Sequence, residues 1–199
     1  MISPGPFLLL GKYTILIRPQ AGKGRITVKE SEQEIVNVDT LEQRVLKALY
    51  FVKDPEINTL SIIELGMLEQ LEVRDNKVKI RLLPTFMGCP ALDIIKNNIE
   101  KAIAELSDQI EVDVQFIYHP PWTSARVSEA GRQKLKEFGI APPPKVFGAD
   151  GSWSVNCPYC DSEYTSMDNL FGPTACRSIL YCKSCKNPFE AMKPVSTLM

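Results

Sequence analysis

Apolar residues recur at helical spacing in three stretches of the chain after residue 38. Asp39 and Glu42 predict a capping box at the start of the first helix. The third helix is predicted over Ser128–Phe138, with Ser128 as its N-cap and Gly139 as its C′ residue. The apolar positions of the first two helices are Leu41, Val45, Leu49, Val52, Leu92, Ile95, Ile99 and Ile103.

Alternating apolar and polar residues predict three strands between those helices. Leu68–Arg74 and Lys77–Leu83 form a hairpin about the Asp75-Asn76 turn. A third strand covers Glu111–Tyr118. The helix between the second and third strands makes a right-handed crossover that joins parallel strands. The predicted fold class is therefore α+β, with a small three-stranded sheet and helices packed mainly on one face.

Composition and turn residues divide the chain into four regions. Before the main domain, Tyr13–Ile17 and Arg25–Lys29 are strand-like and predict a β-hairpin. Ala141-Pro-Pro-Pro144 predicts a stiff tether without helix potential. The regions are an N-terminal extension over residues 1–38, a main domain over 39–140, a Pro-rich linker over 141–147 and a metal-binding module over 148–195.

Two Cys-x-x-Cys motifs, Cys157-Pro-Tyr-Cys160 and Cys182-Lys-Ser-Cys185, are separated by residues 161–181. Each pair can hold one metal ion from a tight turn, and two such turns complete a tetrahedral shell of four thiolates. Disulfides are the alternative, but six cysteines among 199 residues are few for a disulfide scaffold. The motifs predict a C-terminal zinc-ribbon-like module. Iron or an iron–sulfur cluster stays open as its metal, because thiolates alone do not select zinc.

Charge and hydropathy narrow the partners and the compartment. The chain is 44% hydrophobic with net charge −1, and no run approaches the ~20 apolar residues of a membrane span. The opening segment is a poor signal peptide, so we expect a cytoplasmic protein. From Gly148 onward the acids outnumber the bases, and four thiolates around a divalent ion add negative charge. We therefore expect neither nucleic-acid nor membrane binding, and homo-oligomerisation stays open.

Cys89 is a second candidate for chemistry. Gly88 permits a turn after a strand, Pro90 suits the first helical position, and Cys89 then falls at or beside the N-cap. Unpaired N–H groups and the helix dipole at that position favour a thiolate, which predicts a reactive or metal-binding thiol. The alternative is a small buried cysteine that fills a loop corner.

Cys176 is a further cysteine inside the predicted ribbon, and one zinc ion needs four ligands only. It is structural, a substitute ligand or a transfer position. Asp54 and Glu56 stand near a helix end, where such residues are usually turn formers. His119, the single histidine, defines no metal site, and we expect its ring to pack beside Trp122.

Several motifs of the chain stand in an order that is known from other proteins. They are Asp54-Pro-Glu-Ile57, Glu64-Leu-Gly-Met67, Pro84-Thr-Phe-Met-Gly-Cys-Pro90, Pro120-Pro-Trp122, Gly131-Arg132, Gly139-Ile140, the two Cys-x-x-Cys pairs, Phe171-Gly-Pro-Thr-Ala-Cys176 and Asn187-Pro-Phe189. The order of the motifs before the ribbon is similar to that of the iron–sulfur assembly domain that includes SufT. With the ribbon, the chain resembles the PaaD family over about residues 40–193.

The resemblance implies an accessory protein of phenylacetate degradation with no catalytic activity of its own. It would assist assembly of the iron–sulfur or di-iron centres of a multicomponent phenylacetyl-CoA epoxidase, with the epoxidase subunits or their iron–sulfur reductase as partners. The family's cysteine maps onto Cys89, and its acids map onto Asp54 and Glu56. These residues, with Cys176, are the candidates for metal or cluster transfer. PaaD-like chains often carry another cysteine after the Pro-Phe element, and this chain has none there.

Other functions stay open on the sequence alone. The chain could be a structural subunit that remains in the oxygenase complex, or a general iron–sulfur carrier for other clients. The charge of the ribbon disfavours a nucleic-acid-binding protein. An autonomous thiol enzyme is disfavoured because no base pairs with Cys89 in the sequence.

Overall fold

The computed structural model describes residues 9–10, 13–14, 40–144 and 153–194. The chain forms two units, residues 1–37 and residues 38–199. In the first unit, β1 (Leu9–Leu10) pairs with β2 (Tyr13–Thr14) in antiparallel fashion. The predicted hairpin partner, Arg25–Lys29, lies outside the described residues.

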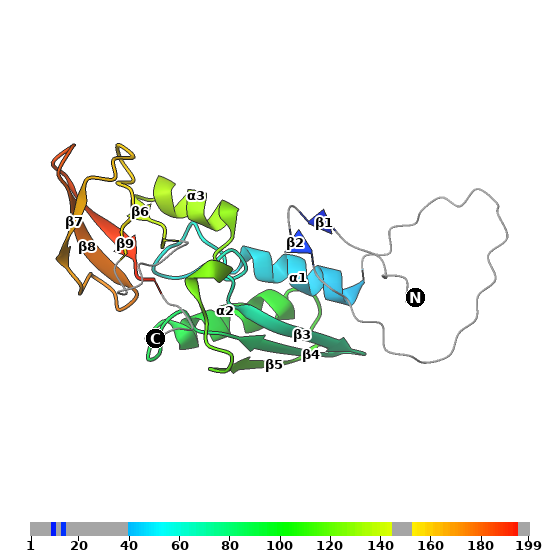
Figure 1. The fold of residues 1–199 in the computed structure, drawn as a ribbon. Helices are drawn as coiled ribbons and strands as arrows, with labels where there is room; N and C mark the ends of the chain where they lie inside the picture. The colour runs from blue at the N-terminus through cyan, green and yellow to red at the C-terminus, as the bar shows by residue number, and fades with distance from the viewer. Residues whose placement is uncertain (1–8, 11–12, 15–39, 145–152, 195–199) are drawn as a thin grey trace, which may run out of the picture. The chain divides into compact units, whose positions relative to one another are not determined.

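The main domain has the predicted order of helices and strands (Figure 1). The three-stranded sheet has the order β3-β4-β5, in which β3 and β4 form the antiparallel hairpin and β4 and β5 are parallel, joined through α2. The elements are α1 (Leu41–Phe51), β3 (Leu68–Arg74), β4 (Lys77–Leu82), α2 (Leu92–Ala104), β5 (Glu111–Phe116), the short 3₁₀ helix η1 (Ser124–Arg126) and α3 (Glu129–Glu137). The predicted α+β class is confirmed.

The core of this domain lies between the sheet and the helices α1 and α2, which cover the same face (Figure 1). The period of two along β4 and the helical periods of α1 and α2 send their apolar residues to this common core. Its fully buried members include Val45, Leu49, Val78, Ile80, Leu82, Ile95, Ile99 and Ile103.

The helix caps agree with the sequence at α3 and differ at α1. Ser128 caps α3 by accepting a hydrogen bond from the N–H of Gly131 at 2.9 Å, as predicted. At α1 the capping box is formed by Thr40 and Gln43, so the predicted pair Asp39 and Glu42 was wrong by one residue. Both pairs fit the sequence pattern, and the chain uses the one that makes Leu41 the first helical residue.

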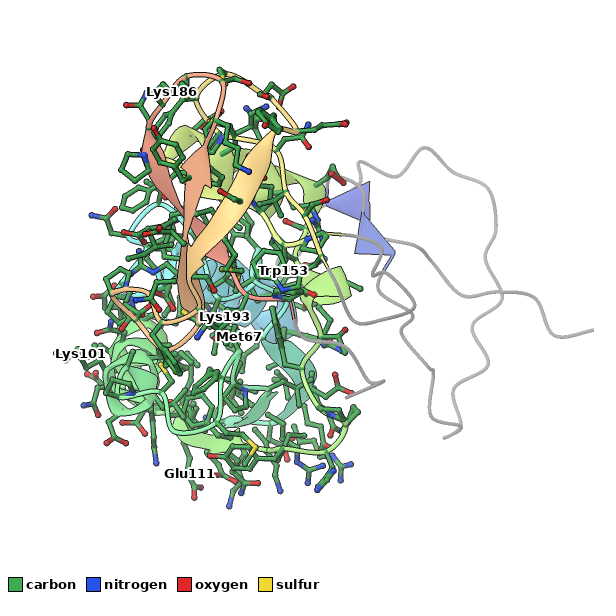
Figure 2. All side chains as sticks on the ribbon, turned by 60° about the vertical axis from the view of Figure 1, so that its left-hand side comes forward. Met67, Lys101, Glu111, Trp153, Lys186 and Lys193 are labelled. Carbon is green, nitrogen blue, oxygen red and sulfur yellow. The ribbon has the colours of Figure 1, made fainter. Side chains whose placement is uncertain are left out.

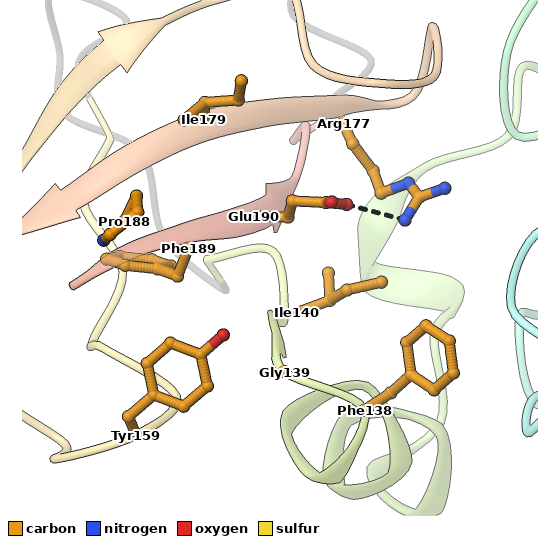
Figure 3. Close-up of a pocket in the computed structure, with 9 residues that line it drawn as sticks. All are labelled: Phe138, Gly139, Ile140, Tyr159, Arg177, Ile179, Pro188, Phe189 and Glu190. Atoms are coloured by element: carbon orange, nitrogen blue, oxygen red, sulfur yellow. Dashed lines mark hydrogen bonds and ion pairs between the residues drawn. The ribbon is translucent and has the colours of Figure 1, made fainter.

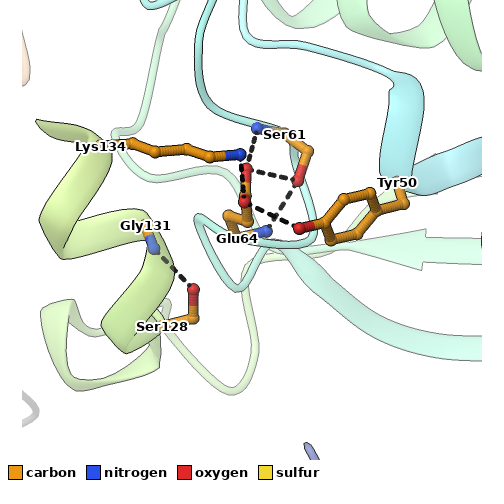
Figure 4. A network of polar contacts seen from close by, with 6 residues as sticks. All are labelled: Tyr50, Ser61, Glu64, Ser128, Gly131 and Lys134. Atoms are coloured by element: carbon orange, nitrogen blue, oxygen red, sulfur yellow. Dashed lines mark hydrogen bonds and ion pairs between the residues drawn. The ribbon is translucent and has the colours of Figure 1, made fainter. Parts of the chain in front are cut away.

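A buried carboxylate fixes the loop between α1 and β3 (Figure 4). Glu64 is 1% exposed and accepts hydrogen bonds from Lys134 at 2.5 Å, from Tyr50 at 2.9 Å and from the N–H and hydroxyl of Ser61. Burial alone would raise the pKa of Glu64, but the hydrogen bonds from Lys134, Ser61 and Tyr50 lower it overall. The network ties α1, the loop and α3 together.

The Pro120-Pro-Trp122 segment contacts the same loop. Trp122 is buried and donates its indole N–H to the carbonyl of Leu65 at 2.9 Å. Gly66, at φ +68°, lies so close to Arg126 that an added Cβ would stand 2.3 Å from its carbonyl oxygen. Only a glycine allows this close approach of the two backbones. His119 is exposed, and it joins no cluster of metal-ligating side chains within the described part of the chain.

The ribbon sheet has the order β6-β9-β8-β7. Its strands are β6 (Ile140–Ala141), β7 (Thr165–Asn169), β8 (Arg177–Cys182) and β9 (Pro188–Met192). Ala141, the first residue of the predicted linker, pairs with Ala191 of β9 and is fully buried. Ile140 packs in the core of the main domain, whereas Ala141 packs in the core of the ribbon. The short strand β6 is therefore one of the places at which the main domain and the ribbon meet.

Candidate functional site

Four cysteines converge at one end of the ribbon. The sulfurs of Cys157, Cys160, Cys182 and Cys185 all lie within 4.8 Å of one another. The Sγ atoms of Cys157 and Cys185 are 3.7 Å apart, and those of Cys160 and Cys182 are 3.6 Å apart. Sulfurs at about 2.3 Å from a tetrahedral Zn²⁺ lie about 3.8 Å from each other, so this arrangement fits the ion. A disulfide needs about 2.05 Å and does not fit.

Both knuckles use the same local geometry. The backbone N–H after each second cysteine bonds back to the carbonyl of the first, from Asp161 to Cys157 and from Lys186 to Cys182, each at 2.9 Å. Asp161 and Lys186 both have positive φ, at 61° and 63°. These left-handed residues close each turn and bring its two sulfurs to one side.

Backbone donors already favour thiolate at one of these sulfurs. The N–H of Cys185 donates to the sulfur of Cys182 at 3.4 Å. This hydrogen bond is the main reason that the pKa of Cys182 falls to about 6. The hydroxyls of Ser162, just after the first knuckle, and Ser184, within the second, are 2.7 Å apart and join the two turns.

Cys89 lies at a different position from the one predicted. The N-cap of α2 is Ala91, so Cys89 stands two residues before the cap and Pro90 precedes the helix. Burial raises the pKa of the Cys89 thiol, and the charges of Glu56 and Asp54 raise it further, whereas the N–H of Ala91 lowers it. The prediction of a stabilised thiolate was therefore wrong, because desolvation and nearby carboxylates outweigh the helix end.

Asp54 and Glu56 have different tasks in the loop after α1. One oxygen of Asp54 accepts the N–H groups of Glu56 and Ile57 at 2.8 and 3.0 Å, which makes it the turn former that its position predicts. Burial raises the pKa of Asp54, although these N–H groups and Arg177 act against that rise. The carboxylate of Glu56 instead points to a thiol, with Oε2 4.0 Å from the sulfur of Cys176.

Cys176 precedes β8, whereas the metal-site residue Cys182 ends that strand. Six residues of extended chain span roughly 20 Å, so Cys176 is remote from the four-cysteine cluster. Figure 2 shows this separation through two labelled lysines. Lys186, beside Cys185, is at the far end of the ribbon, and Lys193, whose N–H bonds to the carbonyl of Cys176 at 2.8 Å, is at the opposite end.

The surroundings of Cys176 could not be predicted from the sequence. Burial raises the pKa of Cys176, and the charges of Glu56 and Asp54 add to the rise. Thr174 lies 3.3 Å from its sulfur, and the same hydroxyl accepts a hydrogen bond from Nε of Arg177 at 2.8 Å. Arg177 is buried and lies 2.6 Å from Glu190 in an ion pair. No motif marks Arg177 as a neighbour of Asp54.

A cavity of about 320 Å³ lies between α3 and the ribbon sheet (Figure 3). Phe138, Ile140 and Phe189 line it, Tyr159 of the first knuckle stands at one side, and the Arg177–Glu190 ion pair closes another. The cavity is largely apolar, and the residues that line it form no cluster of metal-ligating side chains among those that the structure describes. None of the helices in the described ranges is long and apolar enough to cross a membrane.

Comparisons with known proteins match the main domain and the ribbon to two separate families. Residues 42–114 match a family described as "Iron-sulfur cluster assembly protein", and residues 141–193 match the "PaaD zinc beta ribbon domain". A subunit of the "Putative 1,2-phenylacetyl-CoA epoxidase" of Escherichia coli is 34% identical over 143 residues, which cover 71% of this chain and 86% of that protein.

Two further similarities each cover about half of the chain. The "Fe-S protein maturation auxiliary factor YitW" of Bacillus subtilis is 32% identical over 98 residues, which cover 49% of this chain and 95% of that protein. A crystal structure of a DUF59 domain from Bacillus anthracis is 26% identical in sequence, with a TM-score of 0.45. The match covers 48% of this chain and 91% of the chain in that crystal structure.

Proposed function

This chain belongs to the PaaD family, and we propose that it is a maturation factor that delivers iron to a multicomponent oxygenase of the phenylacetyl-CoA epoxidase type. The similarity of its main domain to iron–sulfur maturation factors supports delivery, and the similarity of most of the chain to an epoxidase subunit supports the client. In this role the chain needs no catalytic residue.

The observation that carries the proposal is the presence of two thiol sites of opposite character. The four cysteines of the ribbon form a closed set that fits one ion on all sides. Cys89, in contrast, is a half-buried single thiol whose nearby charges are carboxylates. A structural metal needs the first arrangement, whereas a transferred metal needs a site that can also release it.

The closed set gives the ribbon its structural role. Cys157, Cys160, Cys182 and Cys185 would hold Zn²⁺, which would stabilise the ribbon sheet against unfolding. The sheet in turn joins the main domain through β6, and Lys136 of α3 pairs with Asp161 of the first knuckle at 2.7 Å. The zinc would therefore stabilise the surface that a client protein meets.

The properties of Cys89 suit transient binding. Because its pKa is raised, the thiol holds its proton until iron displaces it, and this cost weakens binding. Glu56 would supply a hard oxygen ligand, which suits divalent iron better than a shell of four thiolates does. Asp54 keeps one oxygen in the turn and would contribute its remaining oxygen or its charge alone.

The test is maturation of the oxygenase in cells that express it with Cys89→Ala or with the natural chain. We expect the variant to fold and keep its zinc, while the purified oxygenase has lost most of its iron and activity. Ser107→Ala, which changes a loop hydroxyl beyond the opposite end of α2, is the control and leaves maturation unchanged. Full iron content and activity with Cys89→Ala would contradict the proposal.

Two rival functions give different results. A structural subunit would co-purify with the oxygenase in equal amounts and would tolerate Cys89→Ala. A general iron–sulfur carrier, which the match of residues 42–114 favours, would restore clients other than the epoxidase. Comparing the iron content of several iron–sulfur proteins in a deletion strain separates the general carrier from the dedicated factor.

A further inference from the structure

The strand β8 connects the four-cysteine set to Cys176. It ends in Cys182, a member of the four-cysteine set, and Cys176 immediately precedes its first residue. The ribbon thus brings Cys176 to the main domain. The sulfur of Cys176 lies 4.0 Å from the carboxylate of Glu56, which is 120 positions earlier in the sequence. The charges of Glu56 and Asp54 act on Cys89 as well as on Cys176, since they raise the pKa of both thiols.

Several contacts hold Cys176 in that place. Its carbonyl accepts the N–H of Lys193 at 2.8 Å, and the ammonium of Lys193 donates to the carbonyl of Ala175 at 2.9 Å. Thr174 contacts the sulfur and is itself held by Arg177. Arg177 and Lys193 also bring positive charge to a site that contains two carboxylates and two thiols.

We propose that the ribbon completes the transfer site, so that one Fe²⁺ ion is held by the thiolates of Cys89 and Cys176 and by the carboxylate of Glu56. This inference rests on the proposed function and names its cargo. Four of the six cysteines belong to the ribbon set, and the two that remain are these. Iron–sulfur clusters are typically held by four cysteine thiolates, so two thiols and a carboxylate favour a single ion.

Binding is balanced by proton release. Two neutral thiols lose their protons to water as two iron–sulfur bonds form, and the Glu56 carboxylate adds one iron–oxygen bond. The iron stays divalent and no electron moves. The ion and its three ligands together carry one net negative charge. The oxygen atoms of Glu56 and the two sulfurs do not yet form a closed set among the described residues, so the ligands must draw together around the ion.

The experiment uses the full chain with its ribbon loaded with zinc, under anaerobic conditions. Co²⁺ is titrated as an optical probe, since thiolate–cobalt bonds absorb in the near ultraviolet, and Fe²⁺ is then titrated with and without sulfide. We expect one further ion per chain, a thiolate–cobalt band, and no sulfide retained with the iron. Zinc content and circular dichroism verify that each variant is folded and loaded.

Three variants and one control assign the ligands. Cys176→Ser and Cys89→Ser should each halve the thiolate–cobalt band and weaken binding by about 10-fold to 100-fold, while Glu56→Gln weakens binding and keeps the band. Glu163→Gln, at an exposed acid of the ribbon, is the matched control and leaves both unchanged. Binding that Cys176→Ser does not alter overturns the inference, and retained sulfide overturns the single-ion cargo.

The two proposals fail in different ways. If Cys176→Ser binds cobalt normally and Cys89→Ser does not, the composite site is wrong and delivery through Cys89 stands. If every variant binds as the natural chain does but Cys89→Ala still blocks maturation, the composite site is wrong and Cys89 acts in another way. If the composite site binds Fe²⁺ as described and Cys89→Ala matures the oxygenase fully, the proposed function fails alone.

Discussion

The main domain and the ribbon are stabilised by different means. Among the described residues, the main core contains 22 buried apolar side chains, drawn mainly from α1, α2, β4 and the loop before β3. The ribbon core contains seven buried residues, and two of them, Cys157 and Cys182, belong to the metal set. A small core supplies little hydrophobic stabilisation, so we expect the ribbon to depend on its ion and the main domain to fold without it.

The largest predicted effect is the loss of that ion. Removing zinc with a chelator, or introducing Cys182→Ser, should unfold the ribbon, because structural zinc contributes about 10–16 kcal/mol of binding free energy in small zinc domains. Amide signals of the ribbon should collapse in nuclear magnetic resonance spectra, while those of α1, α2 and β4 persist. Equal loss of both sets of signals would show that the comparison is wrong.

A cavity made in the apolar core should destabilise the main domain and leave the ribbon intact. Ile99 is fully buried, so Ile99→Ala should lower the free energy of unfolding of the main domain by about 2–5 kcal/mol and leave the zinc content unchanged. Ile94, on the same helix, is 50% exposed, and Ile94→Ala is the matched control with an effect near zero. Chemical denaturation followed by circular dichroism measures both.

The Glu64–Lys134 pair gives a smaller and pH-dependent effect. Lys134→Met should cost about 1–3 kcal/mol, less than a fully buried pair, because the lysine side chain is 33% exposed. Lys136→Met breaks the more exposed pair with Asp161 and should cost about 0–1 kcal/mol. Unfolding free energies near neutral pH test this order. A loss in Lys136→Met that equals or exceeds the loss in Lys134→Met would show that exposure does not decide the strength of the pair.

The sign of the pH dependence follows from the two pKa shifts. The pKa of Glu64 is lowered from 4.5, so its stabilisation is present above that value and is lost as the pH falls through the lower folded pKa. The pKa of Lys134 is raised from 10.5, so its stabilisation is present below that value and is lost as the pH rises through the higher folded pKa. The difference between the natural chain and Lys134→Met should therefore be constant near neutral pH and shrink at both extremes.

The smallest effect concerns a single cap. Thr40→Ala removes the hydroxyl that accepts the N–H of Gln43, and it should lower the free energy of unfolding by about 1 kcal/mol. Glu42→Ala, which the sequence alone marked as a capping residue, should have a smaller effect. The pair of measurements decides which of two overlapping patterns the helix uses.

The sequence predicted those features that depend on short-range periodicity. The three helices, the hairpin and the parallel crossover followed from apolar spacing, because a core face requires that spacing. The four-cysteine set followed from two local turns. The cap at Thr40 was misplaced because two residue pairs, one position apart, match the same pattern.

Features that depend on the tertiary structure escaped prediction. The approach of Cys176 to Glu56 joins residues 120 positions apart, and no local pattern encodes it. The direction of the Cys89 pKa shift depends on burial and on Glu56, which only the folded chain supplies. The strand β6 is two residues long, too short for a period to reveal.

That short strand has a consequence for the order in which the protein can mature. Ile140 pairs with Glu190 and Ala141 pairs with Ala191, so on the ribosome this strand has no partner until the chain has grown by another 50 residues. The main domain can collapse before then, but its Ile140 edge stays unpaired until β9 emerges. The last residue of the four-cysteine set, Cys185, is translated just before β9. Metal capture and closure of the junction therefore become possible almost together, once residues 185–192 have been translated.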